Sequence, residues 1–334
     1  MATTRLSDVI IPAVFAPAVV QRNLQLSNLW RSGIIQTDPE IDALAKGPAG
    51  TSVMPYWNDL TGRSNVGNDD PAVRAVPKKM TMGSDSAIRQ ARNIGVATMN
   101  LTAAFLAQDP ADVAASLVAG FWIREQQLIM FEFLAGVLAS NAANDNGDMV
   151  TDITAETGDP VTPANKLDGI AILAAKQQLG DRSNVLTSII MHSAVRTHLQ
   201  GLGFISTAAP NAVDVGWGTF AGYTVIEDDS VFTEVVDGKV VYYTYLIGRG
   251  AIAYGEGTPK RPSAIEQDES SGNGEGQEIF WSRRHFIMHL RGIKWTGEVM
   301  ADKAPTSAEL MNPLNWRRVY TRKDIRLAII KSNG

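Results

Sequence analysis

The sequence contains no cysteine and only four histidines in 334 residues. Without cysteine, the chain forms no disulfide bond, has no thiolate nucleophile and builds no metal site on thiolate ligands. Two of the histidines, His285 and His289, are four apart on a predicted strand, a spacing too long for them to chelate one ion easily. We interpret these two, together with His192 and His198, as ordinary buried or surface side chains. We therefore expect neither a metal site nor a cofactor.

The common enzyme motifs are also missing. The sequence has no phosphate loop of the Gly-x-x-x-x-Gly-Lys-Ser/Thr type, no Gly-x-Ser-x-Gly turn and no His-Glu-x-x-His pair. The acidic run Glu227-Asp228-Asp229 could hold a cation or act as paired carboxylates, but it follows a predicted strand, where turns commonly carry acidic residues. We expect a structural protein rather than an enzyme. The alternative from another class is a cytoplasmic hydrolytic enzyme that uses Glu227, Asp228 and a histidine.

The chain has no excess of positive charge, since its formal net charge at pH 7 is -5. Proteins that grip nucleic acid usually gather basic residues on one face, whereas a protein that only encloses nucleic acid has no such need. The basic pairs at 78–79, 283–284 and 317–318 are short and scattered. Such pairs suit salt bridges between subunits or loose phosphate contacts better than sequence readout.

Long uninterrupted apolar runs are absent too. The longest apolar stretch, residues 101–138, contains charged residues such as Asp112, Arg124 and Glu132 and cannot cross a bilayer unaided. The first eleven residues do not form a signal peptide. We expect a protein that stays in the cytoplasm where it is made and has no membrane partner.

The strongest local signal that is present is a helix. Asp109 is a candidate N-cap, Pro110 suits the first helical position, and apolar residues then recur at helical spacing as far as residue 140. At 1.5 Å per residue, a helix of about thirty residues is roughly 45 Å long. On the pattern alone, an ordinary amphipathic core helix is the simpler interpretation, and a long structural spine is the alternative. In either case we expect Trp122 to anchor the helix in the core.

An extended hairpin is predicted before this helix. Residues 51–57 have strand character, a second extended stretch lies around 79–82 and 87–89, and residues 61–71 between the two are polar and rich in turn formers. A hairpin alone is marginally stable in water, so it must lie against its own chain or a neighbour. We predict contacts with a neighbour through residues of both strands, namely Met54, Tyr56, Trp57, Lys78 and Lys79.

The middle of the chain alternates between predicted helices and strands. A helix is expected to open at Thr162-Pro163 and end at Gly180, with Leu167, Ile170, Leu173 and Ala174 on one face. The dipeptide Asp237-Gly238 between two β-branched runs predicts a hairpin with a type I′ turn.

The last third of the chain contains a predicted loop and strands. Residues 255–278 are rich in glycine, proline and charge, which predicts an exposed, mobile loop. Residues 278–295 alternate as one long strand does, a short helix is expected over 306–310, and Ile325, Leu327 and Ile329 are expected on one face of a final strand.

The order of these segments resembles the major capsid proteins of tailed double-stranded-DNA bacteriophages. Particular stretches are similar to that family as well: Leu29–Gly33, Phe121–Gln127, Phe220–Asp229, Arg291–Trp295 and Asn315–Val319. None of these motifs is specific alone, and their order along nearly the whole chain carries the resemblance.

The resemblance implies an α+β fold of the Hong Kong-phage capsid type. Its parts would be an N-terminal arm at 1–46, an E-loop at 47–95, a first part of the P-domain at 96–161 with the spine helix at 109–140, an A-domain with the exposed loop at 162–277, and P-domain strands with the C-terminal segment at 278–334. In the family the E-loop lies over a neighbouring subunit, and the A-domain points to the centre of pentamers and hexamers.

The resemblance also implies function and partners. The chain would assemble with itself into pentamers and hexamers of an icosahedral shell around double-stranded DNA, without recognising a DNA sequence. Its expected partners are a separate scaffolding protein, a portal and decoration proteins, and it would reside in the virion after assembly in the host cytoplasm. The closest alternative is an encapsulin-like shell that houses protein cargo. Some relatives join E-loop lysines to asparagines covalently, for which Lys78 or Lys79 and Asn312 or Asn315 are candidates, but we favour a non-covalent shell.

Overall fold

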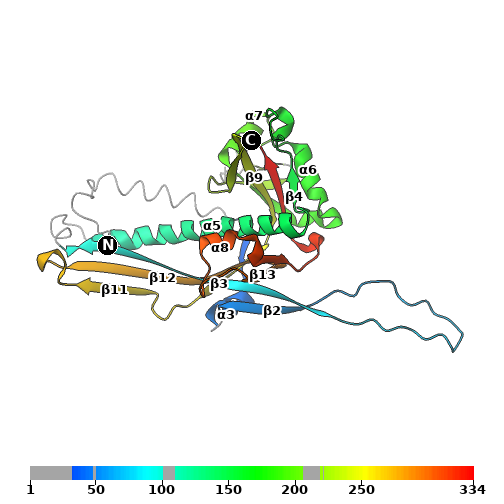
Figure 1. Cartoon of the computed structure of the whole chain (residues 1–334), viewed down its shortest axis with the longest axis horizontal. Helices are drawn as coiled ribbons and strands as arrows, with labels where there is room; N and C mark the ends of the chain where they lie inside the picture. Colours follow the sequence, from blue (N-terminus) through cyan, green and yellow to red (C-terminus); the bar gives the residue numbers. More distant parts are fainter. Residues whose placement is uncertain (1–31, 48–49, 101–109, 206–218, 221) are drawn as a thin grey trace, which may run out of the picture.

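The computed structural model describes residues 32–47, 50–100, 110–205, 219–220 and 222–334. The molecule is elongated: a long helix lies along a long sheet, an α/β lobe stands at one end of the helix, and a hairpin projects away from the sheet (Figure 1). Most of the predicted arm, the stretch Leu29–Arg31 and the proposed N-cap Asp109 lie outside the described residues.

The long sheet has the strand order β1-β10-β12-β3-β2, with β11 also paired to β12. Its strands are β1 (Ile35–Thr37), β2 (Thr51–Trp57), β3 (Met82–Met99), β10 (Ile252–Gly257), β11 (Ser263–Asp268) and β12 (Gln277–Leu290). Strands β10 and β11 follow one another along the same side of β12, since β10 pairs with residues 285–290 and β11 with residues 277–282. Helix α3 (Pro39–Lys46) packs on β10. The end of the predicted arm is therefore part of this sheet.

Two predictions for this region are wrong. The segment 255–278 is not a mobile loop, because it contains β11, which pairs with β12 over six residues. Its glycines and prolines mark the two turns on either side of β11, and composition alone cannot reveal a short polar edge strand between two turns. The predicted single strand over 278–295 is two strands. β12 ends at Leu290, Gly292 has a φ of 89°, and β13 (Ile293–Trp295) pairs with β14 (Trp316–Arg318).

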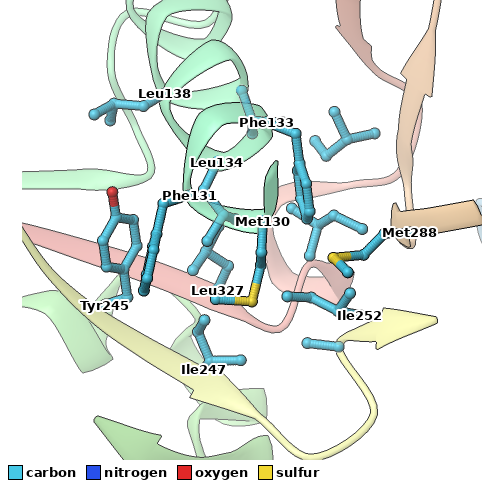
Figure 2. Close-up of a cluster of buried hydrophobic side chains, with 14 of the residues drawn as sticks. Met130, Phe131, Phe133, Leu134, Leu138, Tyr245, Ile247, Ile252, Met288 and Leu327 are labelled. Atoms are coloured by element: carbon cyan, nitrogen blue, oxygen red, sulfur yellow. The ribbon is translucent and has the colours of Figure 1, made fainter. Parts of the chain in front are cut away.

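The helix predicted over 109–140 is α5 in the structure, Pro110–Asn144. Its second half is buried on almost every side, because the long sheet packs on one side and the sheet of the α/β lobe on the other. Figure 2 shows Met130, Phe131 and Leu134 of α5 among side chains from both sheets. Helix α5 thus lies between the two parts of the molecule, as the spine interpretation requires.

The α/β lobe is built on a second sheet with the order β4-β15-β9-β5-β7-β6, and β8 pairs with β9. Its elements are β4 (Val150–Asp152), α6 (Gly169–Gln177), β5 (Leu186–Met191), α7 (Ser193–Gly201), β6 (Thr219–Phe220), β7 (Tyr223–Glu227), β8 (Thr233–Val236), β9 (Lys239–Gly248) and β15 (Leu327–Ser332). Side chains of α6 and α7 pack in one cluster with side chains of this sheet, and the second half of α5 packs in another with the remaining sheet side chains.

The helix predicted from Thr162 to Gly180 is corrected by the structure. A single 3-10 turn, Pro163–Asn165, comes first, and α6 starts only after Asp168, whose side chain accepts a hydrogen bond from the Ala171 amide. Ile170 and Leu173 are 75% and 65% exposed. Ala171, Ile172 and Ala175 are buried instead. The small side chains of Ala171 and Ala175 let the helix approach the sheet closely, and Ile170 and Leu173 point outward.

Two local predictions are confirmed. Asp237 and Gly238 between β8 and β9 both have positive φ, 52° and 72°, as a type I′ turn requires. Helix α8 (Ser307–Met311) begins after Thr306, whose hydroxyl and Glu309 form a capping box. Over the described residues, no helix combines the length and apolarity needed to cross a membrane.

Candidate intersubunit contact surface

The hairpin β2–β3 has two unlike faces. The strands pair in register from Thr51 opposite Ile88 to Trp57 opposite Met82. Because side chains alternate between the faces of a strand, Met54 and Tyr56 point one way while Trp57 points the other. Trp57 is 62% exposed and Met82 is exposed beside it. Toward the end of the paired strands, the outward face is therefore apolar and uncovered in the single subunit.

The inward face of the hairpin holds it to its own chain. The Tyr56 hydroxyl donates to the Val319 carbonyl at 3.0 Å, and the Tyr56 ring meets the Tyr320 ring edge-to-face with 4.8 Å between the ring centres. Burial, together with the nearby charge of Asp85, raises the pKa of Tyr56. Met54 packs against a small buried cluster around Ile287. Of the predicted neighbour contacts, Met54 and Tyr56 thus also make contacts within the subunit, and their contact with a neighbour stays a prediction.

The residues between the two strands, 58–81, are called the tip segment below. Every residue of the tip segment is exposed, and its large apolar members are Leu60, Val66, Val73, Val76 and Met80. Val66 is the extreme case at 92% exposed. The segment is cross-braced only weakly, for example by the Asn65 side chain, which donates to the Val76 carbonyl at 3.2 Å. Of the two predicted lysines, Lys78 donates to the Thr61 carbonyl at 3.0 Å, and Lys79 is exposed.

Trp122 of α5 lies against β12. It is 1% exposed, and its indole N–H donates to the Ser282 hydroxyl at 2.9 Å. The guanidinium of Arg284 lies 5.8 Å from the centre of the indole ring, within range of a cation–π contact. The side chain therefore joins the helix to the long sheet.

The acidic run 227–229 is occupied by structural contacts. Glu227 forms an ion pair with Arg196. Asp228 accepts hydrogen bonds from Gln127 of α5 and from the Ser230 amide, and burial raises its pKa. Asp229 accepts from the Ser193 amide at 3.0 Å, and the hydrogen bonding of Ser193 lowers the Asp229 pKa. These residues fasten the start of α7 and tie the lobe to α5.

The histidine beside this run is engaged as well. His192 caps α7, because its ring nitrogen accepts from the Ala194 amide at 3.1 Å. It lies 3.7 Å from Asp229. No group of three or more acidic or histidine side chains suited to a metal ion occurs in the described part of the chain. The arrangement favours structural roles for His192 and the acidic run, namely capping α7 and joining the lobe to α5, over hydrolytic chemistry.

Two polar clusters in the structure were not predicted from the sequence. In one, Arg318 forms ion pairs with Asp145 and Asp148 beyond the end of α5, and Arg322 donates to the Asp148 carbonyl and to Gln178. Burial lowers the pKa of Arg322 to about 10. In the other, Asp85 of β3 meets His289 of β12 in a buried pair. The only sequence signal for Asp85 is an acidic residue inside a predicted extended stretch.

Comparison with known proteins gives consistent results. The family described as Gp13-like, major capsid protein 13-like, matches residues 52–325. The major capsid protein of Bacillus phage SPP1 is 39% identical over 335 residues, covering 99% of this chain and 98% of that protein. Among solved structures, the capsid of Ralstonia phage GP4 has a TM-score of 0.59 at 10% identity, over 90% of this chain and 87% of that one. The capsid of the native GTA particle, computed with C5 symmetry, has a TM-score of 0.53 at 10% identity, over 100% and 94% of the two chains. At this identity, the likeness to the solved structures is one of fold.

Proposed function

Because this chain belongs to the Gp13-like family of major capsid proteins, we propose that its copies join in pentamers and hexamers that close into the icosahedral shell of a tailed bacteriophage. The chain is a structural protein of the capsid and not an enzyme. Its α+β architecture is the Hong Kong-phage capsid fold. The strong identity to a phage protein favours a phage capsid over an encapsulin-like compartment.

The observation that carries this proposal is the uncovered tip segment with the outward face of the hairpin. Large apolar side chains are costly to leave in water, and contiguous apolar patches on a subunit mark interaction sites. A hairpin that projects from the body reaches a partner rather than its own core (Figure 1). Head-to-tail contacts of this kind build rings, and closure makes many modest interfaces act together.

We assign the contact with a neighbour to the outward face. Trp57 and Met82 are its apolar centre, and Lys78 and Lys79 lie farther along the tip segment. Met54 and Tyr56 support this face from behind. Trp122 anchors α5 to the long sheet through its hydrogen bond to Ser282.

The domain boundaries are proposals as well. We retain the arm at 1–46, the E-loop at 47–95, and P-domain parts at 96–161 and 278–334. Since β3 runs unbroken to Met99, the E-loop and the P-domain share a strand. Since β10 and β11 pair with β12, we move them from the proposed A-domain, 162–277, into the P-domain.

The remaining partners are also part of the proposal. The shell encloses double-stranded DNA without reading its sequence, which fits a chain with a net charge of -5. A separate scaffolding protein, a portal and decoration proteins complete the particle, and assembly takes place in the host cytoplasm. Nuclease-protected DNA inside purified particles is the expected result, whereas protein cargo alone would favour the compartment.

The test is to shorten the tip segment. Replacing residues 60–79 by a short Gly-Ser linker should leave the unfolding temperature within a few degrees of that of the unaltered chain, because the tip buries nothing in its own subunit. Electron microscopy should show closed shells for the unaltered chain, with scaffold if needed, and none for the shortened one. A control of full length, with serine at Leu60, Val66, Val73, Val76 and Met80, separates apolar contact from reach. Normal shells from both variants would contradict the proposal.

A further inference from the structure

The strand β3 changes partners at one point along its length. Residues 82–88 pair with β2, and residues 89–99 pair with β12 on the opposite side. The two ladders do not overlap, because the β2 ladder ends at Ile88 and the β12 ladder begins at Arg89, whose amide makes one further bond on the β2 side, to the Gly50 carbonyl. Among the described residues, the backbone therefore joins the hairpin to the sheet mainly through the continuity of β3, with the single bond from Arg89 to Gly50 at the crossover point. A strand paired on one side can bend and twist there, so side chains must set the angle.

Asp85 provides that restraint. It is 4% exposed, and one carboxylate oxygen accepts both from the His289 ring at 2.9 Å and from the Gly292 amide at 3.0 Å. The other oxygen accepts from the Ser86 amide at 2.8 Å. His289 lies on β12, and Gly292 forms the turn after it. A single side chain of the hairpin thus holds two points of the body of the protein.

Other contacts support the same junction. The Ser86 hydroxyl donates to the Trp295 carbonyl at 2.7 Å, and the Tyr56 hydroxyl donates to the Val319 carbonyl. On the β2 side, the Arg89 amide and guanidinium donate to the carbonyls of Gly50 and Gly47. In all of these contacts the acceptor is a backbone carbonyl, which cannot move by a change of rotamer. The contacts therefore restrict the direction in which the hairpin leaves the sheet.

A buried aspartate in a strand is unfavourable unless its hydrogen bonds are complete. Asp85 carries this cost of burial, and its carboxylate accepts from three donors. Removing the carboxylate would leave each of these donors without its partner. The angle matters because the tip segment acts as a lever. Its half-length of about 12 residues spans up to about 40 Å at roughly 3.3 Å per residue, so a swing of about 10° moves the end by about 7 Å.

We infer that Asp85 is a positioning residue: through His289 and Gly292 it sets the angle at which the hairpin leaves the long sheet, and so selects where the tip segment meets the adjoining subunit. The second half of this statement rests on the proposed shell function. The first half concerns the isolated subunit and can be tested without assembly.

The first experiment measures the angle in the unassembled subunit. The chain has no cysteine of its own, so Met82→Cys and Ile265→Cys, both at exposed positions, place one spin label at the end of the paired hairpin and one on β11. We expect a narrow distance distribution for the parent protein, one at least twice as wide after Asp85→Ala, and a narrow one after Asp85→Asn. The amide oxygen of asparagine can still accept from His289 and Gly292. A broad distribution in the parent, or a narrow one after Asp85→Ala, overturns the inference.

If circular dichroism shows that Asp85→Ala is unfolded, the double variant Tyr56→Phe/Ser86→Ala takes its place under the same criteria. It removes two hydroxyl bonds of the junction and no buried charge. Gln126→Ala is the matched stability control, because the buried hydrogen bond that it removes joins α5 to Tyr254 of β10 and includes no residue of the hairpin. It should leave the distribution narrow, and equal broadening there would overturn the inference.

The second experiment measures shell diameters by electron microscopy. We expect one size for the parent, Asp85→Asn and Gln126→Ala, and mixed or open particles for Asp85→Ala. Uniform shells of parent size from Asp85→Ala overturn the role in selecting the contact. If the parent itself forms no shells, the proposed function fails, while the label distances still decide the junction.

Discussion

At the scale of single residues, two carboxyl groups, one within α5 and one just beyond its end, have pKa values shifted in opposite directions. Burial raises the pKa of Glu132 in the middle of α5, while a hydrogen bond with Ser307 and the charge of Arg92 oppose the rise. One oxygen of its carboxylate is buried without a hydrogen-bond partner. For Asp148 beyond the end of α5, burial is outweighed by hydrogen bonds from Arg318 and Asn141, so its pKa is lowered. Ionisation therefore weakens the fold at Glu132 and strengthens it at Asp148.

Glu132→Gln should stabilise the protein at neutral pH by about 1 kcal/mol or less. A carboxyl group whose folded pKa lies above its unfolded value supports the fold below the unfolded value, 4.5, and loses that support as the pH rises through the folded pKa. The gain should thus appear at pH 7 and disappear at about pH 4. Urea unfolding at the two pH values measures it, with the exposed Glu298→Gln as the control. An equal gain at both pH values would count against this account.

At the scale of elements, the packing of α5 against the C-terminal segment depends on one glycine. A Cβ at Gly136 would overlap the Leu310 carbonyl and the Trp316 indole. That indole N–H donates to the same carbonyl at 2.7 Å, and Ser140 one turn later donates to the Trp316 carbonyl. The glycine thus lets α8 and β14 lie directly on the helix.

Gly136→Ala should destabilise the protein by roughly 1 to 3 kcal/mol, the usual cost of overpacking a core. This outcome is opposite in sign to helix propensity, which favours alanine by about 1 kcal/mol. Gly201→Ala is the matched control, because a Cβ at the end of α7 meets nothing within 4 Å. Chemical denaturation compares the free energies of unfolding of the two variants. A stabilised Gly136→Ala would show that α8 can shift to make room for the added methyl group.

At the scale of the whole molecule, the subunit exposes large apolar side chains on its projections. Besides those of the tip segment, one group lies on the outer face of α6 and on the β8–β9 hairpin, at Ile170, Leu173, Val235, Val236 and Val240. Both places belong to the α/β lobe, far from the hairpin β2–β3 in Figure 1. A shell subunit needs contacts on more than one side, because head-to-tail rings use two different surfaces of each copy.

Ile170→Ser/Leu173→Ser should therefore reduce the yield of closed shells at least several-fold while leaving the unfolding temperature nearly unchanged. Both side chains are mostly exposed in the single subunit, so they stabilise only an assembled state. Electron microscopy and a thermal melt on the same sample provide the two readouts. Gln177→Ser, an exposed polar position on the same helix, is the control. Normal shells from the double variant would place the ring contact elsewhere on the lobe.

The sequence predicted well those parts whose signal is local. The apolar repeat behind Pro110 predicted α5, Asp237-Gly238 predicted the turn between β8 and β9, and Thr306 predicted the start of α8. Each depends on residues within a few positions of one another. The fold type came from the order of such segments and from the family resemblance, and the comparisons agree with it.

The predictions that failed depended on partners far away in the sequence. β11 forms because it pairs with the edge of β12, and the buried face of α6 is determined by the sheet on which the helix packs. The contacts of Met54 with the cluster around Ile287 and of Tyr56 with Val319 were likewise not visible in the sequence. Asp85 and His289 are separated by 204 positions along the chain.

Turn chemistry, caps and helical repeats depend on short-range energies, so the sequence alone determined those elements with a local signal, their order and the resemblance to the capsid family. Which face of each element is buried, and which carboxylate finds its donors, depends on contacts that form only when distant segments meet. The tertiary structure alone therefore decided that the hairpin presents Trp57 outward and holds its angle through Asp85.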